Sequence, residues 1–195
     1  MLYKNREKFA KVGEVAGRRM SFISPNRWTL VSLAAALAAS YFIASRQLHY
    51  AAIFFIVMAL ADFFDGAVAR HRKSATQKGA FYDTITDRYV EFVLVISLML
   101  AGIPDFIIDA EIWLLLLLFG SVMTTYARAA AKRELGIEVK GGIVERGERL
   151  IILFMGIVSS ALFGLVYLSY FVAALAVLSN ISALQRIASS LKVAG

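Results

Sequence analysis

Apolar stretches of about twenty residues recur along this chain of 195 residues, and short polar segments separate them. A helix needs about 20 predominantly apolar residues to cross a bilayer. The pattern therefore predicts an all-α integral membrane protein with six transmembrane helices. The predicted spans cover residues 28–44, 50–71, 79–101, 112–132, 143–163 and 165–187.

The N-terminal segment, residues 1–20, has a different pattern. Charged side chains alternate there with apolar ones, which is typical of an amphipathic helix lying on a membrane surface. The breaker residue Pro25 follows, at the start of the first span. We predict a single membrane domain over residues 1–195, made of this juxtamembrane helix and a six-helix bundle over residues 28–187.

Lysine and arginine are distributed unevenly among the polar segments. The N-terminal segment, the loops after the second and fourth spans and the C-terminal end are basic, whereas residues 104–111 contain acidic residues but no lysine or arginine. The positive-inside rule places both termini in the cytoplasm. We therefore expect a multi-pass protein of the cell membrane, in contact with lipids, whose active site faces the cytoplasm.

Composition supports this setting and excludes several functions. Hydrophobic residues make up 59% of the chain, more than the half or so that is usual for a soluble domain. Cysteine is absent, which excludes disulfides and thiolate zinc sites. The net charge is +7, but the basic residues flank the apolar spans. We therefore expect anionic lipids or phosphorylated substrates as partners, and no nucleic acid.

Four aspartates interrupt the apolar pattern of the second and third spans. Asp62 and Asp65 are three residues apart and Asp83 and Asp87 four apart, so each pair lies on one helix face. Carboxylates at membrane depth repel one another and are costly to desolvate, so they require a cation. Mg²⁺ is often held by carboxylates together with substrate phosphates. The aspartates therefore predict a metal site for Mg²⁺, or for Mn²⁺ in its place.

The aspartates belong to a longer pattern with fixed spacing. It reads Asp62-x-x-Asp65-Gly66-x-x-Ala69-Arg70, then eight residues, then Gly79-x-x-x-Asp83-x-x-x-Asp87. This pattern resembles the signature of the CDP-alcohol phosphatidyltransferases at every fixed position. The resemblance implies a six-span enzyme, forming a homodimer, that transfers the phospholipid moiety of a CDP-activated lipid to an alcohol and releases CMP.

The resemblance also implies roles for individual residues. Asp62, Asp65 and Asp83 would bind one metal ion, and Asp62, Asp83 and Asp87 would contribute to a second. Asp87 would be the catalytic base. The residues expected around the CDP moiety of the lipid are Pro25, Asn26, Thr29, Gly66, Arg70, Thr76 and Gly79.

A second basic group points to the acceptor. Arg128, Arg146 and Arg186 fall at the cytoplasmic ends of the fourth, fifth and sixth spans. A phosphorylated acceptor needs such charge-assisted donors, whereas a neutral alcohol does not. The segment 141–150 and the pair Gln185-Arg186 are similar to the subfamily that uses inositol phosphate. This similarity implies that the three arginines bind the acceptor's phosphate, with CDP-archaeol or CDP-diacylglycerol as the lipid donor.

Three alternatives remain open at this point. The arginines could serve only as positive-inside anchors. The acceptor could be glycerol 3-phosphate, which would make the protein a phosphatidylglycerophosphate synthase. A divalent-cation transporter is a non-enzymatic alternative, but it would spread its carboxylates along a pathway, whereas these cluster at one depth beside Arg70.

Overall fold

The computed structural model describes residues 6–74, 76–138 and 141–194 of the chain. These ranges form seven α-helices and no strand, apart from an isolated bridge between Phe106 and Ile108. The prediction of an all-α protein is therefore confirmed. The helices are α1 (Arg6–Met20), α2 (Pro25–Ala44), α3 (Leu48–His71), α4 (Gln77–Ala101), α5 (Ala110–Glu134), α6 (Arg146–Phe163) and α7 (Val166–Ala194).

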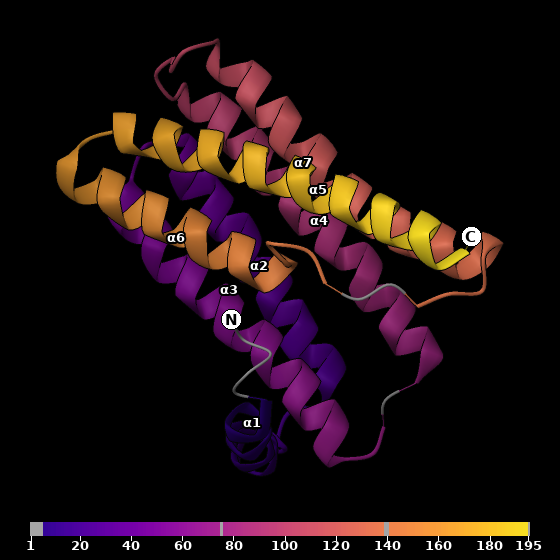
Figure 1. Ribbon diagram of the computed structural model, residues 1–195. Coiled ribbons are helices and arrows are strands. Elements are labelled where there is room, and N and C mark those ends of the chain that lie inside the picture. The colour runs from indigo at the N-terminus through magenta and orange to yellow at the C-terminus, as the bar shows by residue number, and fades with distance from the viewer. Residues whose placement is uncertain (1–5, 75, 139–140, 195) are drawn as a thin grey trace. The chain divides into compact units, whose positions relative to one another are not determined.

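The chain folds into two compact units. The first comprises Met1–Tyr41 and Ile53–Leu94, and the second comprises Phe42–Ala52 and Val95–Gly195. The first unit therefore contains α1 and most of α2, α3 and α4, while α5, α6 and α7 belong to the second (Figure 1). All four predicted aspartates lie in the first unit, and all three predicted acceptor arginines lie in the second.

In the first unit, α1 packs against the C-terminal part of α3 through a glycine. A Cβ atom at Gly17 would lie 2.5 Å from the carbonyl oxygen of Ala67, so only glycine allows the two backbones to come this close. The guanidinium of Arg72 also donates a hydrogen bond to the carbonyl of Ser21, just after α1. The N-terminal helix thus contacts the helix that carries Asp62 and Asp65.

In the second unit, α7 packs against both α5 and α6 (Figure 1). A Cβ at Gly120 of α5 would lie 2.8 Å from the backbone nitrogen of Asn180, and the Asn180 side-chain amide donates to the carbonyl of Leu116 at 2.8 Å. A Cβ at Gly156 of α6 would lie 2.8 Å from Cβ of Phe171. Small residues that allow such close approach are typical of helix packing inside membranes.

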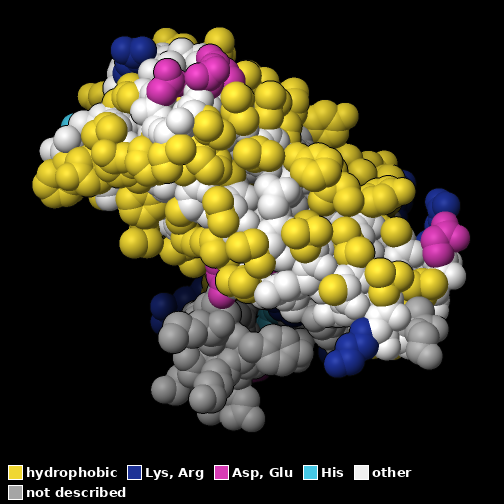
Figure 2. Space-filling view, turned by 45° about the horizontal axis from the view of Figure 1, so that its top comes forward, with side chains coloured by type: hydrophobic (Ala, Val, Ile, Leu, Met, Phe, Trp, Pro, Cys, Tyr) yellow, Lys and Arg dark blue, Asp and Glu magenta, His cyan; other side chains and the backbone are white. Residues whose placement is uncertain are grey.

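Among the described residues, four helices are long and apolar enough to cross a membrane, namely α2, α3, α5 and α7. α4 and α6 are not among them, since Asp87, Arg88 and Glu91 interrupt the apolar part of α4, and Arg146, Glu148 and Arg149 lie at the start of the short helix α6. Apolar side chains such as Leu100 and Phe163 are exposed, and hydrophobic side chains cover most of the face shown in Figure 2. These features indicate a membrane protein, while the number of six spans stays a prediction.

The last two predicted spans differ from the helices in their bounds. The fifth was predicted from residue 143, but α6 begins at Arg146. Gly141 and Gly142 have φ angles of +97° and +147°, which helical residues do not adopt, and Glu145 then caps α6 in a capping box with Glu148. The sixth was predicted to end at residue 187, whereas α7 continues past the apolar stretch to its end at Ala194.

Candidate active site

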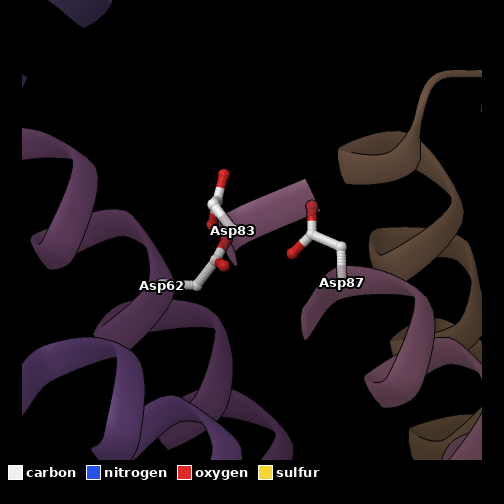
Figure 3. A group of neighbouring side chains, drawn as sticks. All are labelled: Asp62, Asp83 and Asp87. Carbon is white, nitrogen blue, oxygen red and sulfur yellow. The ribbon is translucent and has the colours of Figure 1, made fainter. Parts of the chain in front are cut away.

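Three of the four predicted aspartates converge in the first unit. Asp62 extends from α3, and Asp83 and Asp87 extend from successive turns of α4 (Figure 3). One carboxylate oxygen from each lies within 4.8 Å of the others. Asp62 and Asp87 are partly buried and Asp83 is exposed, so the group is accessible from one side. Oxygen ligands at this spacing suit a hard divalent cation.

Asp65, the fourth predicted aspartate, has a hydrogen-bond partner on α2. The described residues that form the close carboxylate group are Asp62, Asp83 and Asp87, and Asp65 is not among them. Its Oδ2 instead accepts a hydrogen bond of 3.0 Å from the hydroxyl of Thr29 on α2. The structure therefore brings together the carboxylates predicted for the second ion, whereas the trio predicted for the first ion, which includes Asp65, is not assembled at this distance.

Beside the carboxylates lies a pocket of about 610 Å³ within the first unit. All seven residues predicted to surround the CDP moiety line it, together with Asp65 and Asp83. Sequence reasoning did not nominate Ser24, Arg72, Ser74 or Ala80 as site residues. The full lining is Ser24, Pro25, Asn26, Thr29, Asp65, Gly66, Ala69, Arg70, Arg72, Ser74, Thr76, Gly79, Ala80 and Asp83.

Local structure explains why several of these residue types stand where they do. Pro25 is the first residue of α2, where its missing N–H is not needed by the helix. Thr76 directly precedes α4, and its hydroxyl accepts a hydrogen bond of 3.0 Å from the N–H of Gly79, as an N-cap residue does. Thr76 and the motif residue Gly79 thus lie at the start of the helix that presents Asp83 and Asp87.

Gly66 leaves space for the side chain of Arg70, one turn further along α3. A Cβ at Gly66 would lie 3.2 Å from Nη1 of Arg70, which is tighter than an ordinary contact. A Cβ at Gly13 of α1 would meet Nη2 of the same guanidinium at 3.8 Å. The guanidinium therefore lies near two glycines and at the edge of the pocket, where its planar fork can hold a phosphate by two hydrogen bonds.

The predicted acceptor arginines lie on three helices of the second unit, in unlike environments. Arg128 is exposed on α5 and Arg146 is partly buried at the start of α6. Arg186 on α7 is only 5% exposed. Its Nε donates to the carbonyl of Gly141 at 2.7 Å, and its Nη1 donates to the carbonyl of Thr124 at 2.8 Å. Two of the N–H groups of Arg186 are therefore bonded to backbone carbonyls of its own unit.

Arg149 was not nominated as a site residue. It is 6% exposed, and its Nη2 donates to the hydroxyl of Ser121 on α5 at 3.2 Å. Its spacing of three residues from Arg146 places both on neighbouring positions of one helix face. This spacing was the signal in the sequence that could have identified it.

The comparisons with known proteins decide the family. The family model described as CDP-alcohol phosphatidyltransferase matches residues 22–184. The chain belongs to the CDP-alcohol phosphatidyltransferase family. It is therefore a phosphotransferase of phospholipid synthesis, and the family predicted from the aspartate motif is confirmed.

Two curated relatives match most of the length of this phosphatidyltransferase. It is 31% identical over 189 residues to the archaetidylinositol phosphate synthase of Pyrococcus horikoshii, covering 96% of this chain and 95% of the relative. It is 34% identical over 158 residues to a protein of the same name from Methanothermobacter thermautotrophicus, covering 81% and 78%.

Solved structures of the phosphatidylinositol phosphate synthase of Mycobacterium tuberculosis are similar to it. The complex with manganese and citrate has a TM-score of 0.78 at 27% identity, covering 92% of this chain and 88% of the other. The structure with CDP-DAG bound has a TM-score of 0.75 at 27% identity, covering 93% and 92%.

Proposed function

We propose that this phosphatidyltransferase transfers the phospholipid moiety of a CDP-activated lipid, CDP-archaeol or CDP-diacylglycerol, to inositol phosphate and releases CMP. The pocket in the first unit carries the proposal, because all seven residues predicted around the CDP moiety line it beside Asp65 and Asp83. The archaetidylinositol phosphate synthases among its relatives, and the similar structure with CDP-DAG bound, support this donor and acceptor.

The residues present fit a divalent metal ion. Asp62, Asp83 and Asp87 offer three carboxylate oxygens within 4.8 Å of one another, and two of these aspartates are partly buried. Bound there, Mg²⁺ or Mn²⁺ would balance the negative charge that develops on the phosphates during transfer. The manganese in a similar structure supports this assignment. We propose two ions, with Asp65 joining Asp62 and Asp83 at the first.

The chain's own residues then account for the binding of the donor. Arg70 would hold a phosphate of the CDP group by bidentate hydrogen bonds, since its guanidinium lies at the edge of the pocket. Gly66 and Gly79 leave room for the nucleotide to approach the backbone. Pro25, Asn26, Thr29 and Thr76 line the same pocket and would complete the contacts with the nucleotide.

The transfer itself is a displacement at phosphorus. A hydroxyl oxygen of the acceptor attacks the phosphorus atom that carries the lipid, and the bond from this phosphorus to the oxygen it shares with the CMP phosphate breaks. CMP leaves with that oxygen. Asp87 would take the proton of the attacking hydroxyl, as a carboxylate within reach of it can do. Asp87 is suited to this role because it is partly buried and lies at the carboxylate group.

For the acceptor, we propose that Arg128, Arg146 and Arg186 bind the phosphate of inositol phosphate. A dianionic phosphate gains most from guanidinium donors that are partly withdrawn from water, as Arg146 and Arg186 are. Arg128, which is exposed, would contribute least. The assignment distinguishes a phosphorylated acceptor from a free alcohol such as inositol or serine.

We further propose that the chain forms a single membrane domain of six spans with an N-terminal surface helix, that its active site faces the cytoplasm and that it assembles as a homodimer. The basic segments on one side of the predicted spans support this orientation. α4 and α6 would complete the six spans beside α2, α3, α5 and α7.

The proposed function can be tested by comparing different acceptors. Purified protein with Mg²⁺ and either CDP-archaeol or CDP-diacylglycerol is offered inositol phosphate, inositol, glycerol 3-phosphate or serine, and CMP release is measured. We expect release with inositol phosphate and little with inositol. Release with glycerol 3-phosphate alone would make the protein a phosphatidylglycerophosphate synthase, and equal use of inositol and inositol phosphate would contradict the role of the arginines.

A further inference from the structure

Residues 141–145, which lead into α6, are hydrogen-bonded to side chains from one turn of α7. The hydroxyl of Ser182 accepts a hydrogen bond of 2.9 Å from the N–H of Val144. The side-chain oxygen of Gln185 accepts one of 3.1 Å from the N–H of Ile143. Two consecutive backbone N–H groups of this segment are thus held by two side chains of α7.

Arg186 completes this attachment from the same turn of α7. Its Nε donates to the carbonyl of Gly141, and its Nη2 lies 4.0 Å from Oε1 of Glu145. A Cβ at Gly142 would lie 3.4 Å from Cβ of Ser182 and 3.5 Å from Nε of Arg186, so the segment is in van der Waals contact with α7. The segment is therefore bound to α7 along its whole length.

This attachment fixes the start of α6, where Arg146 stands. Glu145 is the N-cap of α6, and its side chain and that of Glu148 form a capping box. Arg146 is the next residue, so the position of its backbone follows from that of Glu145. A phosphate clasp requires its arginines to be held in fixed relation, since loose donors lose affinity to conformational entropy.

We propose that Ser182 and Gln185 are positioning residues of the acceptor site. They hold Gly141–Glu145 on α7 and thereby set Arg146, on α6, in register with Arg186, on α7. Neither touches the acceptor. The inference rests on the proposed function, because it takes Arg146 and Arg186 to be ligands of the acceptor's phosphate.

Substitution of each residue gives a distinct test. Ser182→Ala removes the acceptor of the Val144 hydrogen bond, and Gln185→Met keeps the length of the side chain while removing its oxygen. Ser190→Ala is the matched control, because Ser190 is also a buried serine of α7 but donates to the carbonyl of Arg186 within its own helix. Each hydrogen bond is expected to affect acceptor affinity by about three- to tenfold.

Steady-state kinetics with purified protein in detergent then separate positioning from stability. We expect Ser182→Ala and Gln185→Met to raise the KM for inositol phosphate by about three- to tenfold. The KM for CDP-lipid and kcat should stay unchanged, and Ser190→Ala should resemble wild type. Ser182→Ala removes a buried hydroxyl and could lower thermal stability. Gln185→Met changes an exposed side chain, so it tests the proposal without that effect on stability.

The inference is overturned where both variants match Ser190→Ala in the KM for the acceptor, or where the KM values for both substrates rise together. The proposed function is tested separately by wild type. A wild type that uses glycerol 3-phosphate instead overturns the choice of acceptor, and the same comparison is then made with that substrate. A wild type that uses no phosphorylated acceptor overturns both.

Discussion

The contact between α1 and α3 predicts how far alanine substitutions at Gly17 and Gly13 change the stability of the protein. A Cβ at Gly17 would lie 2.5 Å from the carbonyl oxygen of Ala67 and 2.9 Å from Cβ of His71, so Gly17→Ala must push the helices apart. A Cβ at Gly13 meets only Nη2 of Arg70, at 3.8 Å, which is ordinary van der Waals contact. Both substitutions add one methyl group to α1. Only the methyl group at position 17 would overlap with α3.

Both variants gain helix propensity, worth about 0.5–1 kcal/mol for alanine over glycine. Because this gain is common to both, the difference between them isolates the cost of overpacking. Inserting a methyl group into a closely packed contact costs about 1–3 kcal/mol. Gly17→Ala should be less stable than Gly13→Ala by about that amount, and Gly13→Ala should be at least as stable as wild type.

Thermal unfolding of the purified variants in one detergent measures this difference. Displacement of α3 near Ala67 should also disturb Arg70, three residues further on, so we expect Gly17→Ala to raise the KM for CDP-lipid. Equal stability and equal KM in the two variants would refute the close packing of α1 on α3. Loss of activity in Gly13→Ala alone would show that its contact with Arg70 matters more than the backbone approach.

Further predictions concern the metal and the two substrates. Asp62→Asn and Asp83→Asn should each abolish CMP release in a folded protein, because each removes an anionic metal ligand, and near-normal release by either would contradict the site. Chelation with EDTA should stop the reaction, and Mg²⁺ or Mn²⁺ should restore it; activity that persists in EDTA would exclude an exchangeable metal. Asp87→Asn should lower turnover by about 10²–10⁴-fold with CDP-lipid affinity retained, whereas a loss of affinity at normal turnover would make Asp87 a positioning ligand. Arg146→Ala should raise the KM for inositol phosphate by about ten- to a hundredfold, and an unchanged KM would return Arg146 to a topology anchor.

The helices could be predicted from the sequence because the apolar stretches are long and their polar boundaries are sharp. The predicted start of the second span, residue 50, and that of α3 at Leu48 differ by only two residues. The start of α6 could not be predicted in this way. It is decided by the positive φ of Gly141 and Gly142 and by the cap at Glu145, which the apolar pattern does not record.

Part of the candidate site could also be predicted from the sequence. Fixed spacing placed Asp83 and Asp87 on one face of α4, and the structure brings them to Asp62. The position of Asp65 depends on its hydrogen bond with Thr29, a residue 36 positions earlier, and spacing within one helix carries no information about such a partner. The bonds of Arg186 to backbone carbonyls are likewise tertiary contacts.

Incorporation of radiolabelled inositol phosphate into lipid tests the central claim most directly. Purified wild type with a CDP-activated lipid and Mg²⁺ should move the label from the aqueous phase to the organic phase and release CMP in equal amount. EDTA, or Asp62→Asn in place of wild type, should prevent this. Label that stays in the aqueous phase with both CDP-archaeol and CDP-diacylglycerol, under conditions where another alcohol is consumed, would contradict the proposed function.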